Sequence, residues 1–214
     1  MNKNPREVIL KKIEEALEKK SEKKKIKPDF SKQIYVSSEE DLSVQFAQHL
    51  TQSQGTFFYC ENIEAFQKHF ITLIKQKNLH HIAVWEEEIL KILPSLSTPY
   101  LDKKNTINQI EVGVTSCEYL IARIGGLLFS SKQASGRSLS IYPPIHLVVA
   151  FASQLVYDIQ QGLDLIQKKY TEIPSMICLT TGPSRTADIE KTLVLGAHGP
   201  KELTVFLIDD TLVH

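Results

Sequence analysis

The feature that most constrains the fold is an alternation between residues 34 and 93, where short, continuously apolar stretches are separated by longer amphipathic ones. The apolar stretches have the length of strands and lie at 34–36, 56–60 and 81–85. The stretches between them repeat apolar residues at helical spacing, as Phe66 and Phe70 illustrate. Strands that are apolar on both faces must be covered on both faces, and crossover helices are their usual cover. This part of the chain therefore predicts a parallel sheet flanked by helices.

The spacing changes after residue 105. Further apolar stretches follow one another too closely for crossover helices, at 127–130, 138–142 and 146–151. Some of these strands should therefore pair antiparallel. A capping box at Thr115 and Glu118 predicts a short helix through residue 122, a longer helix is expected over 153–170, and strands are expected at 176–179 and 203–208. The fold class predicted is α/β with a mixed sheet covered by helices.

The N-terminal segment differs in composition from the rest. Asn4 followed by Pro5 is typical of a helix start, and a helix is predicted over residues 4–25, with a narrow apolar stripe that ends at Leu17 and a lysine-rich end. We expect residues 1–30 to form a helical arm that packs on the domain or on a partner chain. Residues 31–214 then form the α/β domain.

Charge and hydropathy argue against several classes of partner. Lys plus Arg and Asp plus Glu number 25 each, so no global field would attract nucleic acid or anionic lipid. No apolar run approaches the roughly 18 residues of a membrane span, and the charged N-terminal residues do not resemble a secretory signal. We therefore expect a cytoplasmic protein without a membrane span, whose charged ligands bind at a local site.

The cysteines and histidines do not predict a metal centre. Cys60, Cys117 and Cys178 lie far apart and form no C-x-x-C pair, which argues against an iron–sulfur or zinc site. His80 and His81 are adjacent, so their side chains point in different directions. No cofactor is expected in this chain.

One turn is the strongest candidate for ligand binding. The strand predicted at 176–179 leads into a Gly-Pro turn and then a predicted helix over 185–195. The N–H groups at a helix start attract anions, glycine permits close approach, and a guanidinium can grip a carboxylate or phosphate with two bonds. The candidate anion-binding residues here are Thr181, Gly182, Ser184, Arg185, Thr186 and Asp188. The alternative is that Ser184 only caps the helix and Arg185 only pairs with Asp188.

Other polar turns could complete such a site. Thr115 and Glu118 follow another strand end, Arg137 supplies a second guanidinium, and His198 is a candidate proton donor. Together they could surround one small anionic ligand. Each also has a structural interpretation, because Thr115 and Glu118 could only cap a helix and His198 could be a cation at a helix end.

The segment from Thr181 to Pro200 resembles the signature of the LUD domain family, in particular its lactate utilization branch. Shorter matches agree with it: Gly113-Val114-Thr115 with Glu118, Gly125-Gly126, Gly136-Arg137 and Pro143-Pro144-Ile145-His146. The resemblance is good over about residues 105–210 and loose over the N-terminal third.

The resemblance implies a fold like that of the NagB/RpiA/CoA-transferase group. It also implies a role in oxidising L-lactate to pyruvate, as a cluster-free subunit acting with partner proteins that carry iron–sulfur clusters. It transfers no catalytic residues. The alternative is a stand-alone enzyme or binding protein for a small phosphate- or carboxylate-bearing ligand, such as a sugar phosphate, an acyl-CoA or a folate.

Overall fold

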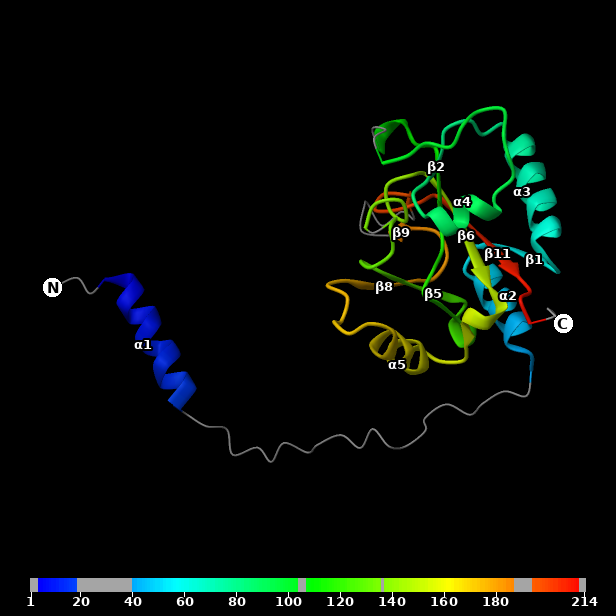
Figure 1. Ribbon diagram of the computed structural model, residues 1–214. Coiled ribbons are helices and arrows are strands. Elements are labelled where there is room, and N and C mark those ends of the chain that lie inside the picture. The colour runs from blue at the N-terminus through cyan, green and yellow to red at the C-terminus, as the bar shows by residue number, and fades with distance from the viewer. Residues whose placement is uncertain (1–3, 19–39, 104–106, 136, 187–193, 212–214) are drawn as a thin grey trace. The chain divides into compact units, whose positions relative to one another are not determined.

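The structure is a computed structural model that describes residues 4–18, 40–103, 107–135, 137–186 and 194–211 (Figure 1). The chain divides into two compact units, Met1–Ser37 and Ser38–His214. In the first unit, helix α1 spans Pro5–Glu18, and the Asn4 side chain accepts a hydrogen bond from the Arg6 N–H at 3.1 Å. The predicted cap at Asn4 is therefore confirmed. Residues 19–25 of the predicted helix and the predicted strand at 34–36 lie outside the described residues.

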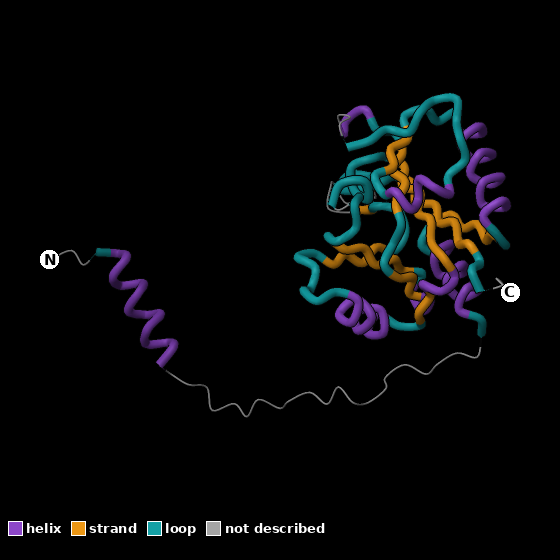
Figure 2. The backbone as a smooth tube through the Cα atoms, viewed as in Figure 1, coloured by secondary structure: helices purple, strands orange, loops and turns teal. Residues whose placement is uncertain are grey.

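The second unit is built on a five-stranded parallel sheet with the order β1-β11-β6-β3-β2 (Figure 2). Its strands are β1 (Thr56–Cys60), β2 (Ile82–Val84), β3 (Val112–Thr115), β6 (Ile145–Phe151) and β11 (Glu202–Ile208). The longest strands, β6 and β11, lie side by side near the centre. The parallel sheet predicted from the alternating pattern is confirmed.

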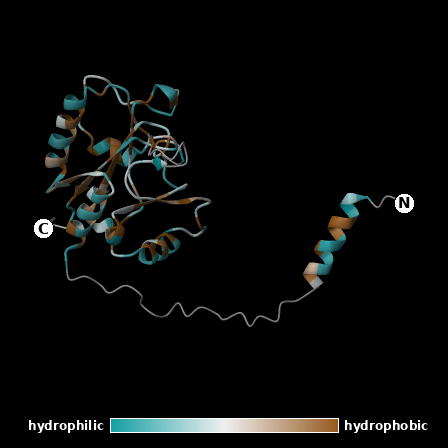
Figure 3. Cartoon of the chain, turned by 180° about the vertical axis from the view of Figure 1, so that it is seen from behind, coloured by the Kyte–Doolittle hydropathy of each residue, from teal (hydrophilic) through white to brown (hydrophobic). Residues whose placement is uncertain are grey.

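Both faces of this sheet are covered because its strands are apolar on both faces. Along β11, Val205 and Leu207 point into one core, whereas Phe206 and Ile208 point into the other. Helix α2 (Leu42–Gln52) covers the first core, and α3 (Ile63–Lys77) with α4 (Glu87–Ile92) covers the second. Figure 3 shows the hydrophobic residues concentrated inside the domain.

Local signals set the starts of α2 and α3 and the end of α3. The Asp41 carboxylate accepts from the Ser43 N–H, and the Asn62 side chain accepts from the Ala65 N–H, as N-caps do. Helix α3 ends at Asn78, which adopts the left-handed conformation with φ 52°. Asparagine tolerates this conformation better than most residues, so the helix stops there.

A second sheet forms after residue 105, with the order β7-β4-β5-β8. Its strands are β4 (Tyr119–Ile121), β5 (Gly126–Ser130), β7 (Leu155–Val156) and β8 (Ile177–Thr180). Of the closely spaced strands from which antiparallel pairing was predicted, only 127–130 pairs in this way, as β5, whereas 146–151 joins the parallel sheet as β6. β5 pairs antiparallel with both β4 and β8. Helix α5 (Ile159–Lys169) packs on this sheet through Ile166. The α/β class is confirmed, and the antiparallel pairs of β5 lie outside the five-stranded parallel sheet.

Three local predictions in this region are wrong. Residues 115–122 do not form a helix, because the Glu118 N–H bonds to the Leu128 carbonyl and draws 119–121 into β4. Residues 138–142 form turns rather than a strand, with the Ile141 N–H bonded to the Ser138 carbonyl. The helix expected from residue 153 begins only at Ile159, because Asp158 caps it and residues 155–156 pair with β4.

Gly125 allows the tightest approach between α2 and the second sheet. It has φ 59°, and a Cβ atom there would lie 2.2 Å from the Leu50 backbone nitrogen. Gly126 has an ordinary φ, and a Cβ there would meet only the ends of the Ile124 and Leu179 side chains at 3.0 Å.

We therefore expect Gly125→Ala to lower the free energy of unfolding by more than about 2 kcal/mol, because it adds both backbone strain and a clash with backbone. Gly126→Ala serves as the matched control and should cost less than about 1 kcal/mol, because flexible side-chain ends can shift. Urea unfolding of both variants measures the difference. Equal losses would contradict this account of the α2 contact.

Candidate functional site

Polar side chains gather at the carboxyl ends of β2 and β3. Glu86 follows β2 and Ser116 follows β3, and the parallel pairing of the two strands brings both residues to the same edge of the sheet. One Glu86 carboxylate oxygen accepts from the Ser116 hydroxyl and from the Ser116 N–H at 3.2 Å. Its other oxygen accepts from the Ser135 hydroxyl at 2.5 Å. Glu86 therefore fastens the 131–144 loop to this edge.

The same contacts continue toward the second sheet. Gln133 donates its side-chain N–H to the Ser116 hydroxyl at 2.9 Å and accepts from the Ser130 N–H at 2.9 Å. Ser130 donates its hydroxyl to Glu118 at 2.5 Å. One chain of hydrogen bonds thus connects Glu86 to Glu118, and we refer to Glu86, Ser116, Gln133, Ser135, Ser130, Glu118, Lys169 and Tyr170 as the polar network.

Glu118 lies at the other end of the polar network from Glu86, and its carboxylate is buried and accepts three hydrogen bonds. Its side chain is 1% exposed, and besides Ser130 it accepts from the Lys169 ammonium at 2.9 Å and the Tyr170 hydroxyl at 2.8 Å. Burial and then the bond to Glu118 raise the pKa of Tyr170. A carboxylate with these partners fastens α5 to the second sheet. The capping-box role considered for Glu118 is therefore wrong.

Thr115 and His146 form a second buried polar pair. The Thr115 hydroxyl donates to the Ser116 carbonyl at 2.8 Å, so it accepts from the His146 Nε2–H at 2.9 Å. The other ring nitrogen, Nδ1, is buried and has no hydrogen-bond partner among the described residues. A proton on Nδ1 would place an unpaired charge in the core, and burial accordingly lowers the pKa of His146 to about 3.

The turn after β8 does not begin a helix. The Ser184 N–H donates to the Pro200 carbonyl at 2.9 Å, and the Ser184 carbonyl accepts from the Gly196 N–H at 2.9 Å. An N-cap carbonyl would instead accept from the following helix. Arg185–Thr186 form strand β9, which pairs antiparallel with β10 (Val194–Leu195). The helix predicted to start at Arg185 is therefore wrong, and Asp188 lies outside the described residues.

These contacts explain the spacing within the 181–200 segment. Gly182 has φ 73°, and a Cβ there would lie 2.2 Å from the Ser53 carbonyl oxygen, so the turn is seated against the end of α2. A Cβ at Gly199 would lie 3.1 Å from the Ser184 Cβ. Gly199 therefore packs against Ser184, whose N–H is already bonded to the Pro200 carbonyl.

Several of the candidate ligand-binding residues predicted from the sequence lie at one or the other end of β8. Arg137 donates to the Ser175 hydroxyl at 2.6 Å, just before β8 begins. Thr181 and Gly182 follow the last residue of β8, and Arg185 is exposed in β9. His198 is exposed in the turn between β10 and β11. Only Thr115 and Glu118 belong to the buried polar groups described above.

Sequence reasoning missed Glu86, Gln133, Ser135 and Ser130. Glu86 carried a usable signal, because it directly follows a predicted strand as Thr115 does. Gln133 and Ser135 carried none, because their roles depend on how the 131–144 loop folds back on the sheet.

No group of three potential metal ligands occurs within the residues that the structure describes. The cysteines are unpaired, and burial raises the pKa of Cys60 to about 11 and that of Cys117 further. No helix in the described segments is long and apolar enough to cross a membrane.

Comparison with known proteins decides the family. The sequence model of the LUD domain matches residues 43–208, which includes both sheets and the 181–200 segment. The chain belongs to the LUD domain family. This LUD domain is 35% identical over 105 residues to lactate utilization protein C of Bacillus subtilis (strain 168), a match that covers 48% of this chain and 44% of that protein.

Other relatives agree with this assignment. The uncharacterized protein YkgG of Escherichia coli (strain K12) is 35% identical over 105 residues, covering 48% of this chain and 46% of that protein. The chain therefore matches about half the length of these curated relatives. A DUF162 family protein from Deinococcus radiodurans has the same fold, with a TM-score of 0.61 at 17% identity over 78% of this chain and 96% of that one.

The buried state of His146 predicts how stability depends on pH. The unfolded chain binds a proton at this histidine below about pH 6.5, whereas the folded protein does so only near pH 3. The stability that His146 confers is thus complete above pH 6.5 and is lost as the pH falls from 6.5 toward 3.

Between pH 7.5 and pH 5.5 the wild type should lose about 1.4 kcal/mol more stability than His146→Gln, which does not titrate. Urea unfolding of both proteins at the two pH values measures this difference. The same loss in both proteins would show that His146 is not the buried neutral group described.

Proposed function

We propose that this LUD domain protein is the cluster-free component of a system that oxidises L-lactate to pyruvate in the cytoplasm. The observation that carries the proposal is its similarity to proteins named lactate utilization protein C, together with the family match over residues 43–208. Oxidising lactate releases two electrons, which need an acceptor. The proposal assigns that role to partner proteins that carry iron–sulfur clusters.

Two features of the described residues support a role that depends on partners and on ligand contacts at turns. The buried acid Glu118 accepts from three donors, which suits it to rigidify the domain. The Arg185 guanidinium is exposed on a short hairpin that Ser184, Gly196 and Pro200 fix in place. In the proposal, this fixed hairpin presents Arg185 to an anionic group of the substrate or of a partner.

Deleting the gene from its natural host should abolish growth on L-lactate and preserve growth on pyruvate. An affinity-tagged copy should restore growth and should retain iron-containing proteins when purified from lactate-grown cells. The purified chain alone should not reduce a dye with L-lactate. Unchanged growth of the deletion strain on L-lactate would overturn the proposal, and robust dye reduction by the chain alone would favour the stand-alone enzyme.

The variant Arg185→Ala tests whether the Arg185 guanidinium takes part in the proposed function. Because Arg185 is exposed, its removal should change the free energy of unfolding by less than about 0.5 kcal/mol, while growth on L-lactate fails. Arg185→Lys should also impair growth, because an ammonium cannot form the two parallel bonds of a guanidinium.

Lys168→Ala, which removes an exposed charge from α5, is the control and should grow normally. Growth rate, protein abundance and thermal unfolding are measured for all three variants. Normal growth of Arg185→Ala at normal abundance would show that the guanidinium has no part in the function.

A further inference from the structure

The two outer edges of the five-stranded sheet differ within the described residues. At the β2 edge, Leu101 donates its N–H to the Ile82 carbonyl at 2.8 Å and accepts from the Val84 N–H at 3.1 Å, so this edge is closed. At the other edge, β1 pairs with β11 and with no second strand of the described chain (Figure 1). The N–H and C=O groups of β1 that point away from β11 are therefore open to another strand.

The sequence of β1 does not protect this open edge. Edge strands of natural proteins usually carry a charged residue, a proline or a bulge that prevents pairing with another chain. β1 reads Thr-Phe-Phe-Tyr-Cys, without a charge or a proline, and pairs with β11 in continuous register without a bulge. Beside it, Val44 and Tyr59 are each 45% exposed and Ile63 is 38% exposed. An unprotected strand flanked by exposed apolar side chains is typical of a surface that pairs with another strand.

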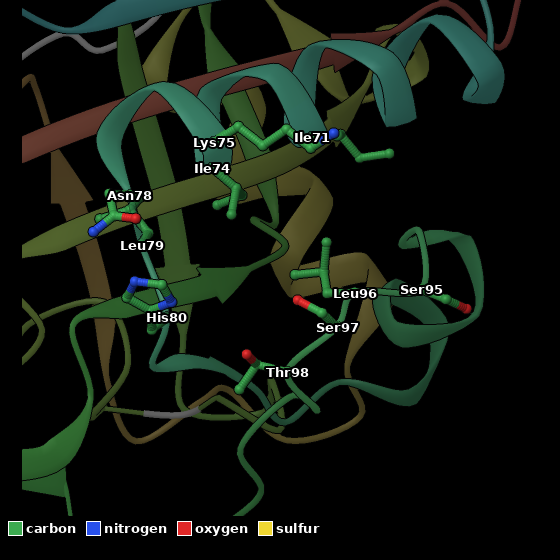
Figure 4. Close-up of a pocket in the computed structure, with 10 residues that line it drawn as sticks. All are labelled: Ile71, Ile74, Lys75, Asn78, Leu79, His80, Ser95, Leu96, Ser97 and Thr98. Carbon is green, nitrogen blue, oxygen red and sulfur yellow. The ribbon is translucent and has the colours of Figure 1, made fainter.

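Two hollows along α2 adjoin this edge. They share Ala47 and Gln48 and form one groove, which we call the α2 groove. A different hollow, at the end of α3, has polar side chains that do not converge, since Lys75 extends along α3 away from Ser97 and Thr98 (Figure 4). The α2 groove is predominantly apolar and continues beside the open strand, so groove and strand form one surface. Its lining includes Val44, Ala47, Gln48 and Thr51 of α2 with Phe57 and Tyr59 of β1.

The hand of the crossovers argues against a strand of the same chain at this edge. The chain passes from β1 to β2 through α3, on the Phe206 side of the sheet, and returns from β3 to β6 and from β6 to β11 through segments on the Val205 side. These three connections have the same hand. A strand that directly preceded α2 and paired in parallel with β1 would cross on the Val205 side while moving toward β2, which gives the opposite hand. Since about 98% of such crossovers are right-handed, a second molecule fits this edge better.

The charges around β1 decide how a second copy of the chain would be oriented. Acidic groups gather at the carboxyl end of β1, where the Tyr59 hydroxyl donates to Asp209 at 2.5 Å and Glu61 follows the strand. The other end is bordered by the uncharged Gln52 and Gln54. Parallel pairing of two copies would place acid against acid, which is destabilising. Antiparallel pairing places each acidic end beside the glutamines of the other copy, whose amides can donate to carboxylates.

We propose that two copies of this chain pair through β1 in antiparallel orientation, so that their five-stranded sheets form one sheet of ten strands. The two-fold axis stands perpendicular to the sheet, which keeps both α2 helices on the same face. There the α2 groove of each copy receives the α2 helix of the other, with the small Ala47 at the contact and Val44 and Tyr59 buried. The inference goes beyond the proposed function, because pairing requires neither lactate nor another protein.

The test is sedimentation equilibrium of the full chain over a range of concentrations. At about 50 µM the wild type should have twice the chain mass of 24.3 kDa, with a dimer Kd of about 10 µM or lower.

Val44→Glu should raise the dimer Kd at least about ten-fold, because it places a carboxylate of each copy in the interface without a cation. Leu90→Glu is the matched control, since Leu90 on α4 is also 45% exposed, and it should dimerise like the wild type. Both positions are exposed, so both variants should fold, and thermal unfolding of the two proteins checks this.

Hydrogen exchange followed by mass spectrometry locates the contact. The β1 amides that point away from β11 should exchange more slowly above the dimer Kd than below it, and Val44→Glu should remove this difference. Exchange in β2 should not change with concentration, because Leu101 already closes that edge.

A monomer at all concentrations overturns the proposal, and slow exchange of β1 in that monomer would show that the same chain covers the edge. A dimer that Val44→Glu does not weaken, or one whose β1 amides exchange as fast as in the monomer, also overturns it. None of these results bears on the growth test on L-lactate, so the two proposals fail separately.

Discussion

The parallel pairing of β6 with β11 is the contact on which the rest of the domain depends. Seven residues of each strand pair in register, and the strands face a core on both sides. The chain leaves this sheet after β6 and returns to it at β11, and α5, β8, β9 and β10 lie between these two strands along the chain. At the return, Lys201 donates its N–H to the Pro144 carbonyl immediately before β11 begins.

This constraint explains the two turns that contain Gly182-Pro183 and Gly199-Pro200. Gly182 is seated on the Ser53 carbonyl, and Pro200 accepts the Ser184 N–H, so the segment is fixed at both of its ends. The polar network does the same at the other edge of the sheet, where Glu86 and Glu118 are joined through Ser116, Gln133 and Ser130. The buried Glu118 carboxylate and the half-buried Glu86 carboxylate stabilise the junction of the two sheets through these bonds, and removing Lys169 would leave the Glu118 carboxylate without its cation.

Local chemistry made some elements predictable. β1 and β11 follow the predicted ranges closely, and α3 lies where the helical spacing of Phe66 and Phe70 predicted a helix, because their apolar periods agree with their tertiary contacts. The helices predicted to start at Thr115 and at Arg185 do not begin there, because pairing with other strands takes precedence: the Glu118 N–H bonds to the Leu128 carbonyl, and Arg185 pairs with Leu195. For the candidate site, the sequence placed Thr115 and Glu118 at a strand end. It could not show that Ser130, Lys169 and Tyr170 would donate hydrogen bonds to the Glu118 carboxylate.

The sequence by itself determined the family, the α/β class, the helix-covered parallel sheet and the presence of antiparallel pairs, because these depend on hydrophobic period and on a long, composite motif. The tertiary structure alone decided which polar groups bond to one another. Glu118 and Ser184 bond to partners from segments that the sequence separates, Lys169 for the first and Pro200 for the second. Such pairs arise from groups that meet across the fold, so no local pattern of residues contains them.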